Sequence, residues 1–168
     1  MHPQQEDFGT IRQMPNQLVL STEGLAHIKL FEGFRAETYD DLEPNAALAA
    51  DGSGVIGTLT IGYGHTGRAA YIGNRITEAD AEALLLDELS GFEEGIERLV
   101  KVPLSQGEYD ALVGFAYNIG LGALQKSTLL RKLNAFDYDG AAMEFGRWVY
   151  SKGRRPVSYT HLTLPTKA

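Results

Sequence analysis

The chain has 168 residues, of which 43% are hydrophobic, so it is long enough to bury a core, and a single domain is expected. It has no cysteine, which excludes disulfides, thiolate metal sites and thiol nucleophiles. Its net charge of -7 argues against a nucleic-acid partner, because phosphate binding needs a basic face.

The first twenty residues are polar and show no apolar periodicity, so the sequence predicts a flexible N-terminal arm over residues 1–20. This segment lacks a basic start followed by an apolar core, and no later segment reaches the roughly 18 uncharged apolar residues of a membrane span. We therefore expect a protein that begins in the cytoplasm and makes no stable membrane insertion.

The next segment has apolar residues at near-helical spacing. From Ser21 to Phe31 these residues predict a first helix, which Gly33 can end. Residues 38–67 then combine many glycines with β-branched residues, which predicts hairpins and loops. This is the only stretch in which strands are expected.

The remainder of the chain is predicted to be helical. Cap signals for four helices lie at Thr77, at Ser105 with Glu108, at Ser127 and at Asp139. Expected stops are Pro103 for the first of these helices and the glycines at 120 and 122 for the second. The predicted fold class is α+β, with a small β-hairpin lobe, a larger helical lobe and a cleft where the two meet.

The last thirteen residues, 156–168, follow no such pattern. They lack helical spacing, and VSYTHLTLPT resembles a sequencing adaptor translated in frame. A translated adaptor sequence is not part of the native protein. The sequence therefore predicts a non-native tail over residues 156–168.

Two carboxylates and a threonine form the candidate catalytic set. Glu32 ends a helix beside Phe31 and Phe34, so we expect poor solvation to raise its pKa and keep it protonated as a general acid. Asp41 lies in the polar hairpin region and is expected to stay ionised, with Thr60 further along. A protonated and an ionised carboxyl group across a shared space can cleave a glycosidic bond.

The same residues belong to a longer pattern. EGFRAETYDD followed by TIGYGHTG resembles the phage-type lysozymes of glycoside hydrolase family 24, the endolysins that cut bacterial cell walls. LSQGEYDALVGFAYNIGLGAL, KSTLLRKLN and FGRWVYSKG extend the resemblance, which covers residues 21–155. It implies a lysozyme-like catalytic domain over these residues, from which the family's further C-terminal helix is missing.

The resemblance also implies a mechanism. Glu32 would be the general acid, while Asp41 and Thr60 would hold the water that attacks the anomeric carbon with inversion. The substrate would be the β-1,4 bond between N-acetylmuramic acid and N-acetylglucosamine in peptidoglycan, with no metal or cofactor. By the same resemblance we expect a monomer that resides in the host cytoplasm before lysis, reaches the wall through a holin and acts there.

The chain departs from the family pattern in one place. The family spacing is Glu, eight residues, Asp or Cys, five residues, then Thr; Glu32 and Asp41 keep the first gap. Eighteen residues, 42–59, separate Asp41 from Thr60, and we interpret them as a longer hairpin or loop. Asp51 inside this insert is a rival second carboxylate.

Further residues are candidates for substrate binding, each with a structural alternative. His65 can be a structural imidazole that ties the hairpin region to the first helix; contact with the sugar is the secondary interpretation. The resemblance makes Phe115 and Asn118 part of the cleft wall, although the end of a helix before glycines also suits Asn118 as a cap residue. Arg147 would lie beside the cleft.

Several alternatives remain open. Thr58 is a rival for the role of Thr60, Glu32 can simply pair with Arg35 at a helix end, and Asp40 fits a turn residue that accepts local amides. Alternative functions are chitin or chitosan hydrolysis, or a non-catalytic wall-binding or virion structural protein of the same fold.

Overall fold

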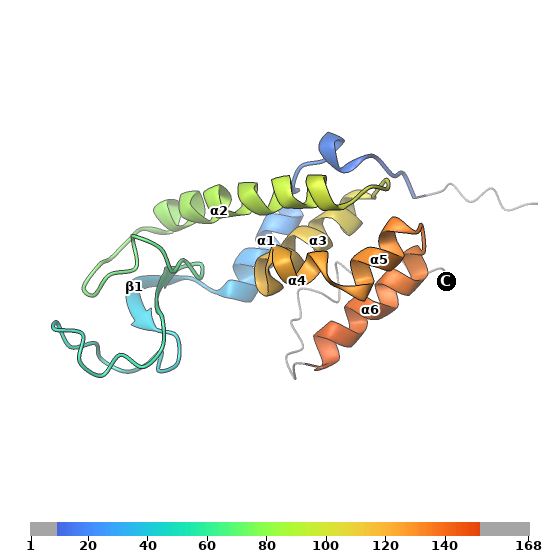
Figure 1. Cartoon of the computed structure of the whole chain (residues 1–168). Helices are drawn as coiled ribbons and strands as arrows, with labels where there is room; N and C mark the ends of the chain where they lie inside the picture. Colours follow the sequence, from blue (N-terminus) through green and yellow to red (C-terminus); the bar gives the residue numbers. More distant parts are fainter. Residues whose placement is uncertain (1–9, 152–168) are drawn as a thin grey trace, which may run out of the picture. The chain divides into compact units, whose positions relative to one another are not determined.

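The computed structural model describes residues 10–151, with side chains as far as residue 147 (Figure 1). It forms two compact units. The hairpin unit is Ala26–Gly91, and the helical unit combines residues 10–25 with 92–151. The predicted non-native tail, 156–168, lies outside the described residues.

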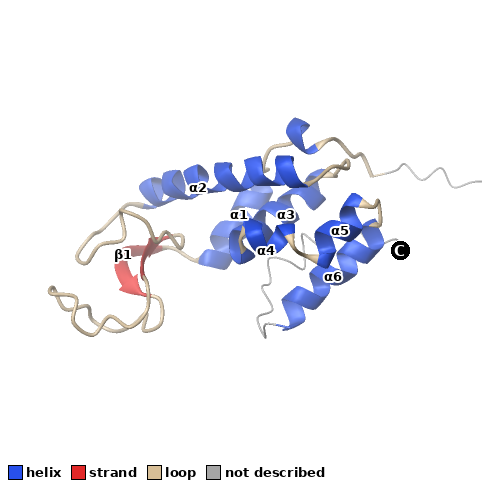
Figure 2. Cartoon of the chain, viewed as in Figure 1, coloured by secondary structure: helices blue, strands red, loops and turns tan. Residues whose placement is uncertain are grey.

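Helices and strands are distinguished in Figure 2. The elements are a short 3-10 helix η1 (Pro15–Gln17), α1 (Thr22–Glu32), β1 (Arg35–Asp40), β2 (Leu59–Gly62), α2 (Glu78–Leu99), α3 (Gln106–Ile119), α4 (Leu121–Gln125), α5 (Thr128–Asn134) and α6 (Tyr138–Ser151). The predicted α+β class is confirmed. In the described part of the chain, no helix is both long and apolar enough to cross a bilayer.

The hairpin unit contains one antiparallel pair of strands. β1 pairs with β2, with Tyr39 opposite Thr60 and Asp40 opposite Leu59. α1 ends as expected before Gly33, whose φ of 71° is a conformation that favours glycine. The strands lie where hairpins were predicted, although β1 already begins at Arg35. Residues 41–58 connect the two strands; they include all of the 18-residue insert except its last residue, Leu59, which begins β2.

Each unit has its own buried apolar residues. Those of the hairpin unit are Ile28, Ile61, Tyr63, Ala81, Leu85 and Leu89. In the helical unit, α3 is buried continuously from Glu108 to Ala116, and Leu124, Leu129, Leu133 and Phe145 are also buried. Leu30, an apolar residue of α1, is 74% exposed and lies outside this core.

Most of the local start and stop signals of the helices were predicted correctly. Thr77 and Ser127 accept amides of the first turns of α2 and α5, and Ser105 forms the capping box of α3. α6 is capped by Asp137, whose carboxylate accepts the amide three residues on at 2.9 Å, rather than by Asp139. The second predicted glycine stop of α3 lies instead within the short helix α4.

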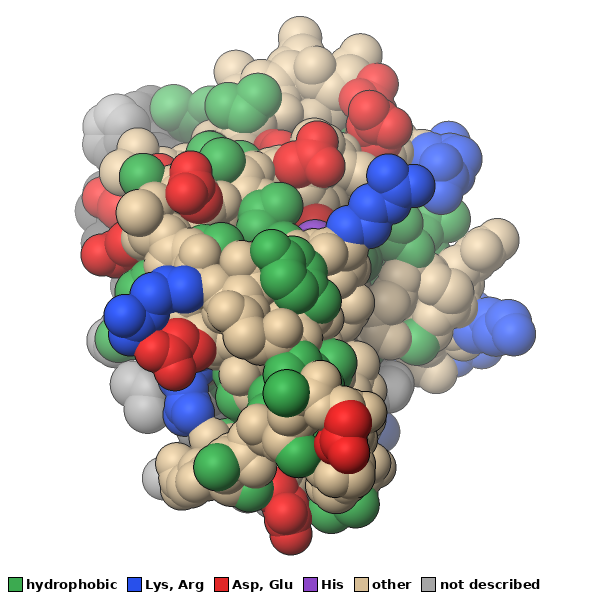
Figure 3. Space-filling view, turned by 90° about the vertical axis from the view of Figure 1, so that its left-hand side faces the viewer, with side chains coloured by type: hydrophobic (Ala, Val, Ile, Leu, Met, Phe, Trp, Pro, Cys, Tyr) green, Lys and Arg blue, Asp and Glu red, His purple; other side chains and the backbone are tan. Residues whose placement is uncertain are grey.

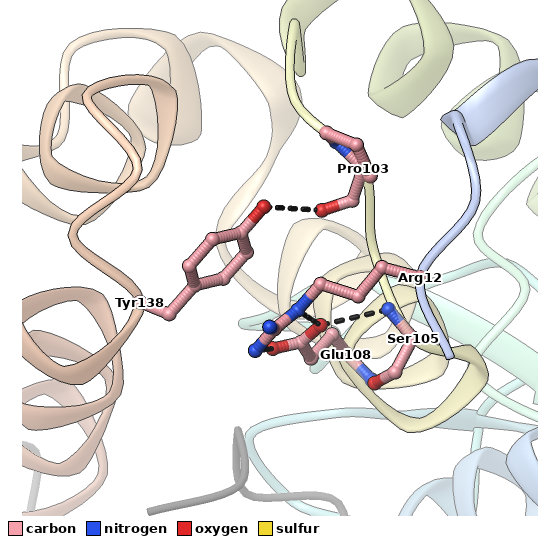
Figure 4. A network of polar contacts seen from close by, with 5 residues as sticks. All are labelled: Arg12, Pro103, Ser105, Glu108 and Tyr138. Atoms are coloured by element: carbon pink, nitrogen blue, oxygen red, sulfur yellow. Dashed lines mark hydrogen bonds and ion pairs between the residues drawn. The ribbon is translucent and has the colours of Figure 1, made fainter. Parts of the chain in front are cut away.

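The described part of the predicted flexible arm is bound to the helical unit. Gln13 and Leu104 exchange two backbone hydrogen bonds of 2.7 Å, and Leu18 is buried. The Arg12 guanidinium donates to both carboxylate oxygens of Glu108, at 2.9 and 3.1 Å, and lies 3.8 Å from the ring centre of Tyr138 (Figure 4). The prediction of a flexible arm is therefore wrong for residues 10–20.

Candidate active site

The register of the hairpin gives Asp41 and Thr60 a common face. Tyr39 lies opposite Thr60, and the Asp41 amide donates to the Thr58 carbonyl at 3.1 Å, which continues the pairing by two residues. Opposite residues of an antiparallel pair share a face, and successive residues alternate. Tyr39, Asp41, Thr58 and Thr60 are therefore on one face, whereas Asp40 is on the other.

The backbone of Thr58 contacts both candidate catalytic side chains of the hairpin. Its amide donates to Oδ1 of Asp41 at 2.6 Å, and its carbonyl accepts the Thr60 hydroxyl at 3.1 Å. Asp41 is exposed and Thr60 is only 4% exposed. The rival threonine at position 58 thus contributes its backbone to the site and holds the other two residues in place.

Tyr39 interacts electrostatically with both Glu32 and Asp41. Glu32 is the last residue of α1 and is half-buried. Burial raises the pKa of the Tyr39 phenol; the Arg35 guanidinium opposes this shift, and the carboxylates of Glu32 and Asp41 add to it. Both acids therefore lie within electrostatic range of one phenol in the hairpin unit. No motif in the sequence singles out Tyr39.

Asp40 anchors the insert. Its carboxylate accepts the amides of Leu42 at 3.0 Å, Ile56 at 2.7 Å and Gly57 at 3.1 Å, and the side chain is only 1% exposed. These amides, the Ile56 amide foremost, lower the pKa of Asp40. The interpretation of Asp40 as an acceptor of nearby amides is confirmed. Its hydrogen bonds also reach amides at both ends of the insert, Leu42 at one end and Ile56 and Gly57 at the other.

The rival carboxylate of Asp51 has the contacts of a turn residue. It is exposed and accepts the Ser53 amide at 2.9 Å, a bond that lowers its pKa. An aspartate that accepts the amide two residues on is typical of a turn. In the described part of the chain, Asp51 forms no hydrogen bond with Thr60 or Glu32. Asp41, in contrast, binds the same Thr58 backbone as Thr60, so the geometry favours Asp41 as the second carboxylate.

His65 is held within the hairpin unit. Its backbone exchanges two 2.9 Å hydrogen bonds with Ile61, and its Nδ1 contacts the carboxylate of Glu88 on α2. The predicted structural imidazole thus binds α2, and the expected tie to the first helix is wrong. Among the described residues, no group of three or more histidine, aspartate and glutamate side chains is arranged to hold a metal ion.

The remaining candidates belong to the helical unit. Phe115 is 2% exposed, and its ring centre lies 5.0 Å from that of Phe145, so it belongs to the core of the helical unit. Asn118 is exposed near the end of α3. Arg147 is also exposed and donates to Glu144 at 3.2 Å. Substrate contact remains a prediction for Asn118 and Arg147.

The chain is similar in sequence to proteins named as bacteriophage endolysins. The chain is 42% identical to the endolysin of Bacillus phage B103 over 80% of its own length, and it spans only 47% of that relative. It is 43% identical to the SAR-endolysin of Escherichia phage Mu, over 60% of this chain and 58% of the relative. The chain thus covers about half the length of these two proteins.

Solved structures and a family comparison agree with this similarity. The crystal structure of a P22 lysozyme mutant matches with a TM-score of 0.68 and 32% identity, covering 87% of this chain and 99% of that one. The predicted lysozyme-like fold is therefore confirmed. Residues 29–160, which include Glu32, Asp41 and Thr60, match the family described as phage lysozyme. The chain belongs to the phage lysozyme family.

Proposed function

We propose that this chain is an endolysin that hydrolyses the β-1,4 bond between N-acetylmuramic acid and N-acetylglucosamine in peptidoglycan, with inversion. Membership of the phage lysozyme family supports a glycoside hydrolase of the lysozyme type. The observation that carries the proposal is the shared contact of Asp41 and Thr60 with the Thr58 backbone. Both side chains bind the backbone of the same residue, and the strand register puts them on one face of the hairpin.

The two acceptors suit a nucleophilic water. The Thr60 hydroxyl proton is donated to the Thr58 carbonyl, so the hydroxyl oxygen can accept a hydrogen bond from water. The Asp41 carboxylate, one oxygen of which is bound to the Thr58 amide, can accept a second one. A water that donates to both side chains keeps its lone pairs for attack on the anomeric carbon. Asp41 then takes the proton that the attacking water loses.

Glu32 is the proposed general acid. It transfers its proton to the glycosidic oxygen as the bond to the anomeric carbon breaks, which releases the leaving sugar as a neutral hydroxyl. Two observations support this role. Glu32 is half-buried at the end of α1, and its carboxylate raises the pKa of the same Tyr39 phenol that Asp41 affects. At the end of the cycle the proton gained by Asp41 returns to solvent and Glu32 is reprotonated.

The test is the hydrolysis of purified cell walls by Glu32→Gln. We expect no detectable clearing and an unchanged melting temperature, whereas Glu23→Gln, an exposed position on the same helix, keeps full activity. Clearing by Glu32→Gln would contradict the general-acid assignment. NMR of products formed by the unmodified chain should show the α-anomer first, and an initial β-anomer would contradict inversion.

We further propose that the protein resides as a monomer in the host cytoplasm until a holin releases it. The family assignment supports action on the wall, whereas relatives named SAR-endolysins point to another route of release. Expression in bacteria with and without a holin gene distinguishes the two. Lysis that needs the holin supports the proposal, and lysis without it contradicts it. Light scattering of the purified chain gives the oligomeric state.

A further inference from the structure

The end of α1 that carries Glu32 also carries a cation. Lys29 precedes Glu32 by three residues on this helix, and side chains three residues apart are neighbours on a helix surface. A free ammonium group beside Glu32 favours the ionised carboxylate, because opposite charges stabilise the charged form. A general acid needs its proton, so the proposed role of Glu32 is favoured when Lys29 binds elsewhere.

Lys29 binds an acid of α2. Its ammonium group donates to Oε2 of Glu82 at 2.6 Å, and this contact is the main cause that raises the pKa of Lys29. The two side chains are 25% and 39% exposed, so water and salt screen the pair only in part. Lys29 is therefore charged, and an acid of α2 compensates its charge.

A buried tyrosine also contacts this lysine. The Lys29 nitrogen lies 5.3 Å from the ring centre of Tyr63, which is only 5% exposed. The Tyr63 hydroxyl in turn donates to Oε1 of Glu78, one helical turn before Glu82, at 2.6 Å. The face of an aromatic ring attracts an ammonium group. Tyr63 and Glu82 thus hold the same ammonium group.

Tyr63 contacts the chain on the other side of Glu32 as well. Its ring centre lies 5.6 Å from that of Phe34, two residues after Glu32. Residues on both sides of Glu32 therefore pack against one buried ring, and that ring is bound to α2 through Glu78. All of these contacts lie within the hairpin unit, so they hold the end of α1 in a defined position against the start of α2.

Several charged or titratable groups lie on the elements around Glu32 in the described part of the hairpin unit. They are Lys29 on α1, Arg35 and Tyr39 on β1, Asp41 after it, and Glu78 and Glu82 on α2. Of the two cations in this set, Arg35 is bound to the Pro44 carbonyl and lies 4.6 Å from the ring centre of Tyr39. Figure 3, which views the β1 side of the chain, shows acidic and basic side chains beside one another on that face. The charge balance at Glu32 thus depends on the partner of Lys29.

We propose that Glu82 is a positioning residue of the active site, which holds the Lys29 ammonium group away from Glu32 so that the general acid keeps its proton. This inference rests on the proposed function of the chain. Glu82 acts through Lys29 and takes no part in proton transfer to the substrate. In Glu82→Gln the lysine loses its anionic partner and becomes free to pair with Glu32, which then loses its proton at a lower pH.

The first test is a pH profile of wall clearing at constant ionic strength and at low wall concentration, where the rate is proportional to kcat/KM. The alkaline limb of this profile reports the ionisation of the general acid in the free enzyme. Glu82→Gln should move this limb to lower pH by roughly 0.5–1 unit and leave the rate on the acidic side within about twofold. Asp87→Asn, which removes an exposed charge of the same helix, is the control and should move the limb by less than about 0.2 unit.

A double-mutant cycle with Lys29→Met separates this effect from the direct field of Glu82. In the Lys29→Met background, Glu82→Gln should move the limb no more than Asp87→Asn does, because no cation remains to be released. An equal shift in both backgrounds, or no shift in Glu82→Gln alone, overturns the proposal.

The second test needs no activity. The Glu32 carboxyl carbon of the same full-length variants is titrated by NMR, and its midpoint should fall in Glu82→Gln only while Lys29 is present. A midpoint that does not respond to Glu82→Gln overturns the proposal. If the unmodified chain clears no walls but the midpoint follows this pattern, the proposed function fails while the effect of Glu82 on Lys29 stands.

Discussion

At the base of the insert, the Gly57 amide donates a hydrogen bond to Oδ2 of Asp40 at 3.1 Å. A side-chain carbon added at Gly57 would collide with the carboxylates of both Asp40 and Asp41. Because position 57 has no side chain, the backbone of the insert can pack directly against Asp40 and Asp41.

Gly57→Ala should consequently damage both stability and activity. We expect the free energy of unfolding to fall by about 1–3 kcal/mol, as for other overpacked sites, because backbone and carboxylates have to shift. Activity should fall further than the loss of folded protein explains, since Asp41 is displaced. Chemical denaturation and wall clearing at a temperature where the variant is folded measure the two effects.

The matched control is Gly91→Ala. Gly91 is an exposed residue within α2, and an added side-chain carbon there meets no atom within 4 Å. Alanine in a helix is favoured over glycine by about 0.5–1 kcal/mol, so this variant should be slightly more stable and equally active. A similar loss of activity in both variants would contradict the role of close packing at position 57.

The two neighbouring aspartates should respond differently to the same substitution. Asp41→Asn should lower kcat by about 100-fold to 10,000-fold, the range for loss of a general base, with an unchanged melting temperature. Asp40→Asn should lower the melting temperature, because Asp40 anchors the insert through three amides. Asp51→Asn should change neither. Equal losses of activity at Asp41 and Asp51 would indicate that the insert has been aligned wrongly with the family pattern.

Acid should weaken the anchor at Asp40. Amide hydrogen bonds lower its folded-state pKa below the ordinary value of 3.8. Its contribution to stability is therefore complete above that value and is lost as the pH falls through the lowered pKa. The melting temperature of the unmodified chain should exceed that of Asp40→Asn by a constant amount above about pH 5 and approach it in stronger acid. A difference independent of pH would contradict this explanation.

Short-range chemistry explains which features the sequence could predict. The capping box of Ser105 and Glu108 and the cap at Ser127 are formed within one helical turn, so the signal and the contact lie in the same short segment. The choice of Asp41 over Asp40 came from the family spacing. The hairpin register supports this choice. Successive side chains of a strand point to opposite faces, so of the two aspartates only Asp41 is on the face of Thr60.

Long-range contacts explain what could not be predicted. Arg12 and Glu108 are 96 residues apart in the sequence, and no local pattern links the N-terminal segment to α3. Phe115 looked like a cleft residue because the family motif includes it, yet continuous burial of α3 places it in the core. The partner of His65 is on α2 rather than on α1, and no periodicity in the sequence distinguishes these two helices.

The contact between Arg12 and Glu108 should stabilise the helical unit. Glu108 is fully buried and also accepts the Ser105 amide at 2.7 Å, so loss of Arg12 leaves part of a buried carboxylate without its partner. We expect Arg12→Met and Glu108→Gln each to lower the free energy of unfolding by about 1–3 kcal/mol. Arg98→Met, at an exposed position of the same unit, should change it by less than about 0.5 kcal/mol. Additive effects in the double variant would show that the two residues do not interact.

The contact of His65 with Glu88 gives a way to separate a structural role from a substrate-binding role. Both side chains are partly buried, and the imidazole ring also fills the space beside Gly67. His65→Asn should lower the free energy of unfolding by about 1–2 kcal/mol and leave KM for walls within twofold of the unmodified value. Glu88→Gln should cause a similar loss, with little further loss in the double variant, because both changes remove the same contact. A raised KM with unchanged stability in His65→Asn would instead place the imidazole against the sugar.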